Sequence, residues 1–245
     1  SDKPSTLTYA VALDEGDPEN EVEYRDEGFQ LKAPFKGEGE SLLKTINRYS
    51  YIEWGKEDMA IAYDYWWNTR NTKSYIFDPT NSEKEPKIIS DRNYQDRYSE
   101  PGDFVTKRNK YGNYVLDVDN GSLYLTGDGF TPEGQFPFVD KYNIETGETT
   151  RLYQSELTDK KENIWDYNPK NNTMLIRMES AVDYPNYYFK DANSGKLTQL
   201  TNFKNPFQAI QDVEKEVVSY KREDGLELTA TLYLPVGYDK AKKEK

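Results

Sequence analysis

Short apolar segments that alternate with polar residues dominate the chain. Residues 59–65, 121–125 and 173–178 are typical examples. Apolar residues at every second position, between clusters of Asn, Gly, Asp and Pro, are typical of antiparallel strands joined by turns. Helical spacing is almost absent. The pattern therefore predicts an all-β protein built from many short strands.

A repeat underlies these strands. Residues 75–89, 142–153 and 188–200 each read as an aromatic strand, a polar turn and a short second strand. Gly147 and Gly195 supply a left-handed backbone conformation in two of the turns. A further strand pair precedes each segment. Four strands recurring at about 45–65 residues are typical of a β-propeller blade, with a β-sandwich of similar hairpins as the alternative.

Residues 1–210 contain three clear units of this kind and an incomplete one before them, so we count about three to four four-stranded blades. Propellers close with four to eight blades, which protects the edges of their sheets. We therefore expect a partial β-propeller, an arc of a larger ring. Open edges invite association, so we predict edge-mediated pairing with a second copy, or trimming of the chain from an intact protein.

The character of the chain changes in residues 211–245. Asp224-Gly225 is a strong signal for a type I′ hairpin turn. Residues 226–234 then alternate strictly, with the apolar side chains on one face. Because a single hairpin cannot bury such an apolar row, this segment is expected to begin a second domain.

Composition excludes several kinds of chemistry. The chain has no His and no Cys, which rules out a Ser-His-Asp or Cys-His relay, a disulfide and an iron–sulfur site within these residues. The 32 Lys and Arg against 44 Asp and Glu give a net charge of −12, which argues against nucleic acid and anionic membranes as partners. No apolar run is long enough to span a membrane.

Two acidic loops, at residues 14–20 and 117–121, resemble calcium-binding loops. Neither has the spacing of a helix-flanked calcium loop with its distal Glu, and turn formation explains both clusters. We expect no metal and no cofactor.

Residues 220–235, followed by Gly237-Tyr238-Asp239, resemble the junction between propeller and catalytic domain in serine peptidases of the prolyl oligopeptidase family. Further motifs are similar to those of the glutamyl endopeptidase branch, in the same order and over nearly the whole chain. They lie at residues 2–7 (DKPSTL), 65–70 (YWWNTR), 98–102 (YSEPG), 129–134 (GFTPEG), 137–138 (PF) and 200–203 (LTNF).

The resemblance implies a parent serine peptidase that cuts after acidic residues, with a propeller capping its active site. The family's catalytic Ser, Asp and His all follow the junction, so no catalytic residue is carried onto this sequence. We expect the partial propeller to be followed by the first β-hairpin of an α/β-hydrolase domain. Its role would be to gate access for the parent's peptide substrate, and the chain by itself would hydrolyse no peptide.

Selecting an acidic side chain requires a cation in a partly desolvated pocket, and the planar fork of Arg suits this role. The first candidates are Arg70, at the turn between two predicted strands, and Arg97, in a loop between blades. The alternative for each is an ion pair, with Asp91 and Asp96 as the nearest acids to Arg92 and Arg97. Lower-ranked candidates are Arg92, Lys107 and Arg108.

Residues 128–138 form a loop rich in Gly and Pro, in which Glu133 is a candidate for recognising a peptide amino terminus. The alternative is a rigid insertion that packs on its own blade. Trp66 and Trp67 are interpreted as packing residues, one facing the core and the other the blade interface.

Two other functions remain open. A stand-alone propeller that binds protein or glycan would also lack catalytic residues. A propeller glycosidase would need two carboxylates roughly 5–9 Å apart, and no spacing singles out such a pair. The sequence leaves the compartment open, with an extracytoplasmic location, periplasmic or secreted, favoured.

Overall fold

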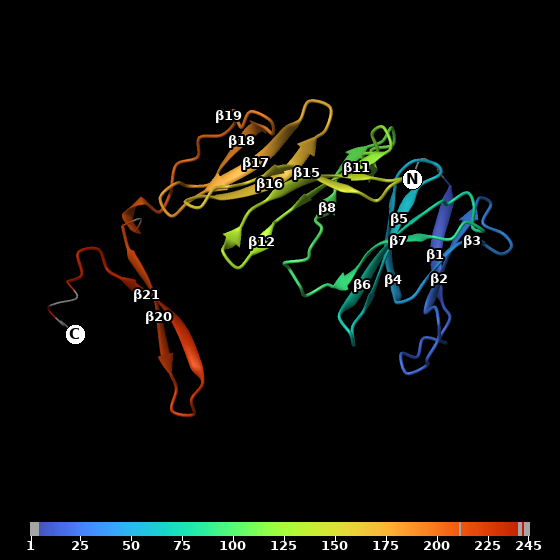
Figure 1. Cartoon of the computed structure of the whole chain (residues 1–245), viewed down its shortest axis with the longest axis horizontal. Coiled ribbons are helices and arrows are strands. Elements are labelled where there is room, and N and C mark those ends of the chain that lie inside the picture. Colours follow the sequence, from blue (N-terminus) through green and yellow to red (C-terminus); the bar gives the residue numbers. More distant parts are fainter. Residues whose placement is uncertain (1–4, 211, 240–241, 243–245) are drawn as a thin grey trace.

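The computed structural model describes residues 5–210, 212–239 and 242. Residues 2–4 of the first family-like motif lie outside the described residues. The described chain is all-β apart from one 3₁₀ turn, Gln208–Ile210, which confirms the expected fold class. Figure 1 shows the sheets following one another along an elongated arc, with a separate hairpin near the C-terminus. No described helix is long and apolar enough to cross a membrane.

Each of four sheets is an antiparallel meander in chain order. The first sheet has three strands, β1 (Thr6–Ala12), β2 (Asp26–Lys32) and β3 (Glu40–Thr45). The second contains β4 (Arg48–Trp54), β5 (Ala60–Trp66), β6 (Asn71–Phe77) and β7 (Lys87–Asn93). The third contains β8 (Asp103–Phe104), β11 (Ser122–Gly127), β14 (Phe138–Asn143) and β15 (Thr149–Gln154), and the fourth β16 (Lys161–Asn168), β17 (Thr173–Glu179), β18 (Asn186–Asp191) and β19 (Leu197–Gln199).

Three two-stranded ribbons complete the described structure. Two of them are insertions in the third sheet: β9 (Thr106–Arg108) with β10 (Tyr114–Leu116), and β12 (Phe130–Thr131) with β13 (Gly134–Gln135). The third is the C-terminal hairpin of β20 (Glu214–Lys221) and β21 (Glu227–Leu234). Its connection spans residues 222–226, and Gly225 has a φ of 86° while Asp224 is not left-handed. The predicted hairpin at Asp224-Gly225 is therefore confirmed, but its connection is longer than a type I′ turn.

Each unit of the predicted repeat corresponds to the hairpin formed by the third and fourth strands of a four-stranded sheet. These hairpins are β6–β7, β14–β15 and β18–β19. In each, the side-chain oxygen of an Asp or Asn accepts a hydrogen bond from the backbone N–H two residues later, which fixes the start of the turn. The bonds are Thr80 to Asp78, Glu145 to Asn143 and Asn193 to Asp191.

The sheets pack face to face because their central strands are apolar on both sides. In β5, Ala60 and Ala62 pack with Leu43 of the first sheet, while Ile61 packs with Leu123 of the third. In β11, Tyr124 turns the other way and packs with the fourth sheet. Alternating side chains of a strand point to opposite faces, so one strand serves two interfaces. We call these interfaces seams.

A buried ionic cluster ties the first sheet to the second. Arg48 on β4 donates to Asp14 at 2.6 Å and to Asp26 at 2.6 Å, and Arg25 donates to Asp14 at 2.7 Å. Both carboxylates are buried. The acidic loop at residues 14–20 is thus closed by arginines of the chain itself, in agreement with its interpretation as a turn.

The outer faces of the terminal sheets are open in the described chain. Leu7 and Tyr9 of β1 pair with Leu31 and Phe29 of β2, so these four side chains share one face. Leu7 and Tyr9 are exposed. At the other end of the arc, Trp165 of β16 is exposed with Tyr187 against its edge.

We expect Leu123→Ala to lower the free energy of unfolding by about 2–5 kcal/mol, because Leu123 is fully buried in the seam between the second and third sheets. Urea titration followed by circular dichroism measures this change. Leu226→Ala, at an exposed leucine in the C-terminal hairpin loop, is the matched control and should stay within about 0.5 kcal/mol. An equal loss of unfolding free energy in the two variants would contradict the conclusion that packing in the seam stabilises the protein.

We expect Asp14→Asn to destabilise the protein at neutral pH and to lose this effect in acid. Burial alone would raise the pKa of Asp14, but hydrogen bonds from Arg48 and Arg25 outweigh it and hold the pKa below 3.8. A carboxyl whose pKa is lowered on folding contributes stability above its ordinary pKa, and this contribution is lost as the pH falls from that value through the lower pKa of the folded state. Urea midpoints of wild type and variant should therefore converge progressively as the pH falls below about 4. Asp17→Asn in the same loop, which keeps its acceptor oxygen, should show no such convergence.

Candidate functional site

The three predicted site residues lie at the same end of the sheets. Consecutive strands of a meander run in opposite directions, so the β5–β6 turn, the β7–β8 loop and the β11–β14 connection share one end. They carry Arg70, Arg97 and Glu133, respectively. The chain also leaves β19 at this end to reach β20, and Figure 1 shows the C-terminal hairpin extending from that side of the arc. We call it the exit end.

Arg70 differs from Arg92 and Arg97, which are both ion-paired, in that its charge is not compensated by a described carboxylate. Its guanidinium stacks over the Trp67 ring, 3.7 Å from the centroid, and donates to the Trp67 carbonyl at 2.6 Å and the Tyr94 hydroxyl at 3.4 Å. No carboxylate of the described residues forms an ion pair with it. The backbone at Arg70 is left-handed, with a φ of 60°, which is unfavourable for a residue with a Cβ. A cation is thus fixed in place without being neutralised.

The stack corrects the interpretation of the tryptophan pair. Trp67 is 65% exposed and packs neither on the core nor on a sheet interface. Trp66 holds a cation as well, since Arg25 lies 3.7 Å from its ring centroid. Trp67 and Arg70 meet because the tight turn between β5 and β6 brings together residues three apart.

Arg97 and Arg92 are ion-paired, but with other acids than expected. Arg97 binds Asp128 at 3.1 Å and stacks over Phe130 at 4.1 Å, which ties the β7–β8 loop to the β12–β13 ribbon. Arg92 lies 3.7 Å from Glu100. The acids adjacent in sequence have other roles: Asp91 pairs with Lys73, and Asp96 accepts the backbone N–H of Tyr98.

Glu133 is exposed in the turn of the β12–β13 ribbon. It borders a hollow between the third and fourth sheets, together with Lys160 and Lys161. Arg70 lines no part of this hollow and contacts Trp67 and Tyr94 instead. The structure therefore brings the predicted residues to one end of the sheets without joining them in one pocket.

A cavity of 360 Å³ opens between the second and third sheets. Tyr94, which accepts the hydrogen bond from Arg70, forms part of its wall, as do Arg92 and Glu100. The remaining wall is rich in tyrosine, which offers apolar faces and hydroxyl groups together. Its other tyrosines are Tyr51, Tyr63, Tyr65 and Tyr142.

Two of these tyrosines form an acid–aromatic cluster that the sequence analysis missed. Tyr51 and Tyr63 stack with ring centroids 4.4 Å apart, and the Tyr63 hydroxyl donates to Glu53 at 2.7 Å. Burial, together with the charges of Glu53 and Asp103, raises the pKa of Tyr51 to about 12. Burial also raises the pKa of Glu53, against the lowering effect of Tyr63. The pairing of Tyr51 with Tyr63 depends on a register shift in β4, which the alternation of residues does not reveal.

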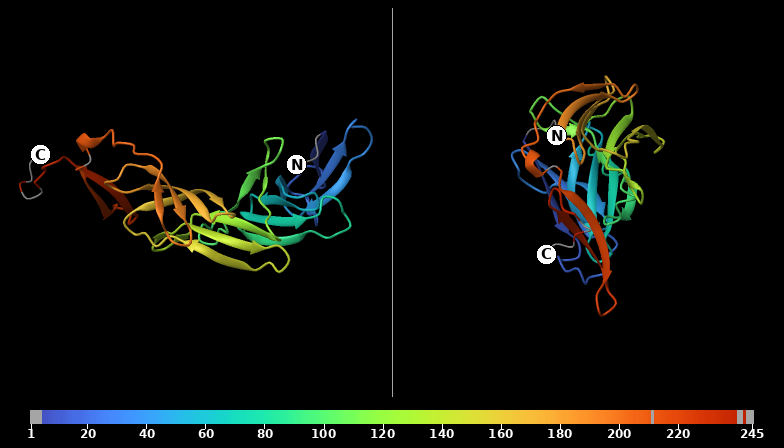
Figure 2. Two further views of the ribbon diagram at one scale, coloured as in Figure 1. Left: turned by 90° about the horizontal axis from the view of Figure 1, so that it is seen from above. Right: turned by 90° about the vertical axis from the view of Figure 1, so that its left-hand side faces the viewer.

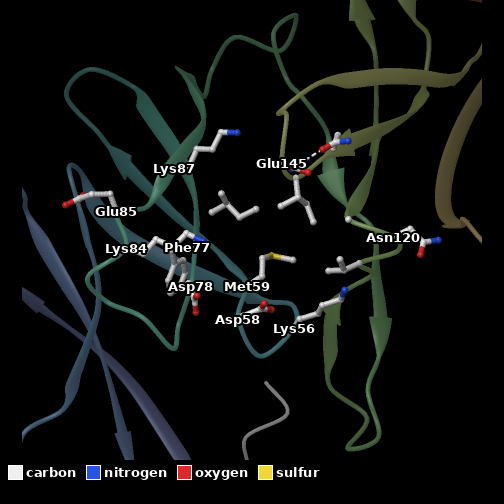
Figure 3. A pocket seen from close by; sticks show the side chains of 15 residues that line it. Lys56, Asp58, Met59, Phe77, Asp78, Lys84, Glu85, Lys87, Asn120 and Glu145 are labelled. Atoms are coloured by element: carbon white, nitrogen blue, oxygen red, sulfur yellow. Dashed lines mark hydrogen bonds between the residues drawn. The ribbon is translucent and has the colours of Figure 1, made fainter.

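A second pocket, of 480 Å³, lies in the same seam at the opposite end of the sheets. Figure 3 shows Met59 at its centre, with Lys87 and Glu145 at one rim and Lys56 and Asp58 at the other. Its charged groups are of both signs, so it presents no net cationic surface to an acidic ligand.

The described residues provide binding groups and no evident bond-breaking centre. They contain no group of three Asp or Glu side chains placed to hold a metal ion. The exit end instead combines a fixed cation, a tyrosine-lined cavity and two loops tied by an ion pair. Such a surface suits the recognition of a peptide.

Comparison with known proteins agrees with this picture. No protein-family profile matches the chain. A probable glutamyl endopeptidase, chloroplastic, of Arabidopsis thaliana is 35% identical over 99% of this chain, and its counterpart in Oryza sativa subsp. japonica is 34% identical over 97%. The chain spans 27% of the length of each. Over nearly its whole length the chain is therefore similar to one part of these probable glutamyl endopeptidases.

Solved structures with a similar arrangement are more distant in sequence. Porphyromonas gingivalis dipeptidyl peptidase 4 is 12% identical, with a TM-score of 0.49 over 96% of this chain and 40% of its own. Oligopeptidase B from Trypanosoma brucei is also 12% identical, with a TM-score of 0.47 over 98% of this chain and 33% of its own.

We expect Arg70→Gly to leave the free energy of unfolding within about 1 kcal/mol of wild type. Glycine removes the left-handed strain, which offsets the lost stacking on Trp67. Chemical denaturation of this chain measures the change. Arg151→Gly is the contrasting variant, because Arg151 pairs with the buried Asp140 and its loss leaves that carboxylate without its cation. A loss for Arg70→Gly as large as for Arg151→Gly would mean that Arg70 is structural.

Proposed function

We propose that this chain is the propeller portion of a glutamyl endopeptidase-like serine peptidase and that it gates and selects the peptide substrate. Identity of 34–35% over nearly the whole chain, within 27% of each relative, supports this proposal. The absence of His in the sequence supports a catalytic centre outside these residues.

The substrate-facing surface would be the exit end. One observation carries this assignment: Arg70 is held rigidly there by Trp67 and Tyr94, and no described carboxylate neutralises it. A guanidinium in this state can form a bidentate pair with a substrate carboxylate. Arg97 would support the site through its tie to Asp128, and Glu133 would take the amino terminus of a peptide.

We further propose a domain boundary near residue 210, with residues 211–245 beginning the catalytic α/β-hydrolase domain. The C-terminal hairpin supports it because both strands leave apolar side chains exposed. Val217 is 72% exposed and Leu232 is 44% exposed. A missing sheet of that domain would cover them.

The compartment proposed for the parent protein is outside the cytosol, in the periplasm or secreted. The chloroplastic location in the names of both curated relatives supports a location outside the cytosol in general.

The test compares Arg70→Gln with wild type in the full-length parent. We expect kcat/KM to fall at least tenfold for substrates with Glu before the cleaved bond, which corresponds to about 1.4 kcal/mol of transition-state stabilisation. The value for a matched Gln substrate should change little. Residues 1–245 alone should hydrolyse neither substrate.

Lys32→Gln is a control, because Lys32 forms an exposed ion pair with Glu40 at the β2–β3 connection, at the opposite end of the sheets from the proposed site. Equal effects of Arg70→Gln and Lys32→Gln on the Glu substrate would overturn the role of Arg70. Hydrolysis by residues 1–245 alone, or a parent without peptidase activity, would overturn the assignment and favour a stand-alone binding module.

A further inference from the structure

A basic ribbon stands out from an otherwise acidic chain. It is formed by β9 and β10, between β8 and β11 of the third sheet. Residues 104–116 contain no acidic residue, and they include Lys107, Arg108 and Lys110. With a net charge of −12 on the whole chain, this is a local reversal of sign. Figures 1 and 2 show the ribbon, in green, projecting beyond the sheets.

The root of the ribbon is anchored in the protein core. Val105, Val115 and Leu116 are all buried. Lys107 adds an ion pair with Asp117 at 2.7 Å, so its charge is already compensated. Since the root cannot move without opening the seam, the ribbon has a fixed direction relative to the sheets.

The tip of the ribbon is ordered by its own turn. The side-chain oxygen of Asn109 accepts the backbone N–H groups of Tyr111 at 2.9 Å and Asn113 at 3.0 Å. Gly112 takes the left-handed conformation that closes the turn, with a φ of 82°. A ligand would therefore meet a tip that needs little ordering on binding, which lowers the entropic cost.

Two cations at the tip are presented over aromatic rings. Arg108 lies 4.9 Å from the Tyr114 ring centroid and donates to its hydroxyl at 3.1 Å, and Lys110 lies 5.0 Å from the Tyr111 ring centroid. Neither cation forms an ion pair with a residue that the structure describes. Tyr111 is 51% exposed and Tyr114 is 63% exposed, so rings and charges face solvent together.

The ribbon lies on the inner side of the arc. It follows β8, the first strand of the third sheet, and β10 lies beside β4, the first strand of the second. In the left view of Figure 2 the ribbon rises on the concave side. In a propeller the first strand of each blade faces the central axis, so a polypeptide moving along that axis would pass the tip.

We propose that the β9–β10 ribbon captures acidic segments of polypeptides. Carboxylates would pair with Arg108 and Lys110, while apolar groups beside them pack on Tyr111 and Tyr114. Two uncompensated cations suit a short run of carboxylates. Nucleic acid is disfavoured, because its affinity comes largely from many phosphate contacts and this tip offers only two uncompensated cations among the described residues. The site is separate from the exit end and requires no catalytic domain.

The test uses this chain, a fluorescein-labelled hexaglutamate peptide and a hexaglutamine peptide with the same label. Fluorescence anisotropy should show saturable binding of hexaglutamate that weakens with salt, and no binding of hexaglutamine. The double variant Arg108→Glu, Lys110→Glu should weaken hexaglutamate binding at least tenfold. Circular dichroism checks that the variant is folded.

The control variant is Lys36→Glu, Lys170→Glu, which changes the net charge equally at two exposed lysines outside the ribbon. It should weaken binding less than threefold. An equal loss of hexaglutamate affinity in both double variants would mean that net charge alone explains the binding, which would overturn the proposal. Binding of hexaglutamine, or tighter ribbon-dependent binding of a labelled oligonucleotide, would overturn the assignment to acidic peptides.

Discussion

The packing of the four sheets depends on central strands that are apolar on both faces. A single meander of this size has little surface to bury, and it gains stability by packing against the neighbouring sheets. Ile61 and its neighbours Ala60 and Ala62 show the principle within three consecutive residues, since they serve two different seams. The loops that carry the candidate site keep their positions because the seams fix the sheets beneath them.

Buried polar groups in the seams determine how neighbouring sheets are oriented relative to one another. Arg48 pairs with two carboxylates of the first sheet. In the fourth sheet, Glu162 pairs with Lys190 at 2.7 Å, and the hydroxyl of Tyr153 from the third sheet hydrogen-bonds to both of these side chains. A buried pair of this kind gives modest net stability, but it strongly disfavours arrangements that leave one charge unpaired. The ties therefore select how neighbouring sheets align. The same principle operates at the surface, where Arg97 joins two loops.

Local features of this protein were predictable, and contacts between distant segments were not. The strands, the repeated turns and the position of Arg70 in a turn follow from alternation and turn residues, which act within a few positions. The partner of Arg97 is Asp128, 31 residues away, because loop paths bring them together while the adjacent Asp96 stabilises its own turn. The stacking of Tyr51 on Tyr63 likewise depends on strand register. The basic character of the ribbon was apparent in the sequence from Lys107 and Arg108. That these cations project on a ribbon apart from the sheets follows only from the pairing of β9 with β10.

The meander order of the strands also determines how the protein can fold. Within each four-stranded sheet, each hydrogen-bonded neighbour is the next strand of that sheet along the chain, so most closures involve short loops and small entropic losses. A sheet can form as soon as its own residues have been synthesised, whereas a seam must wait for the following sheet. Assembly from the first sheet onward then adds only one new apolar face at a time to the open face of that sheet, which limits aggregation of a nascent chain that is rich in β-strands.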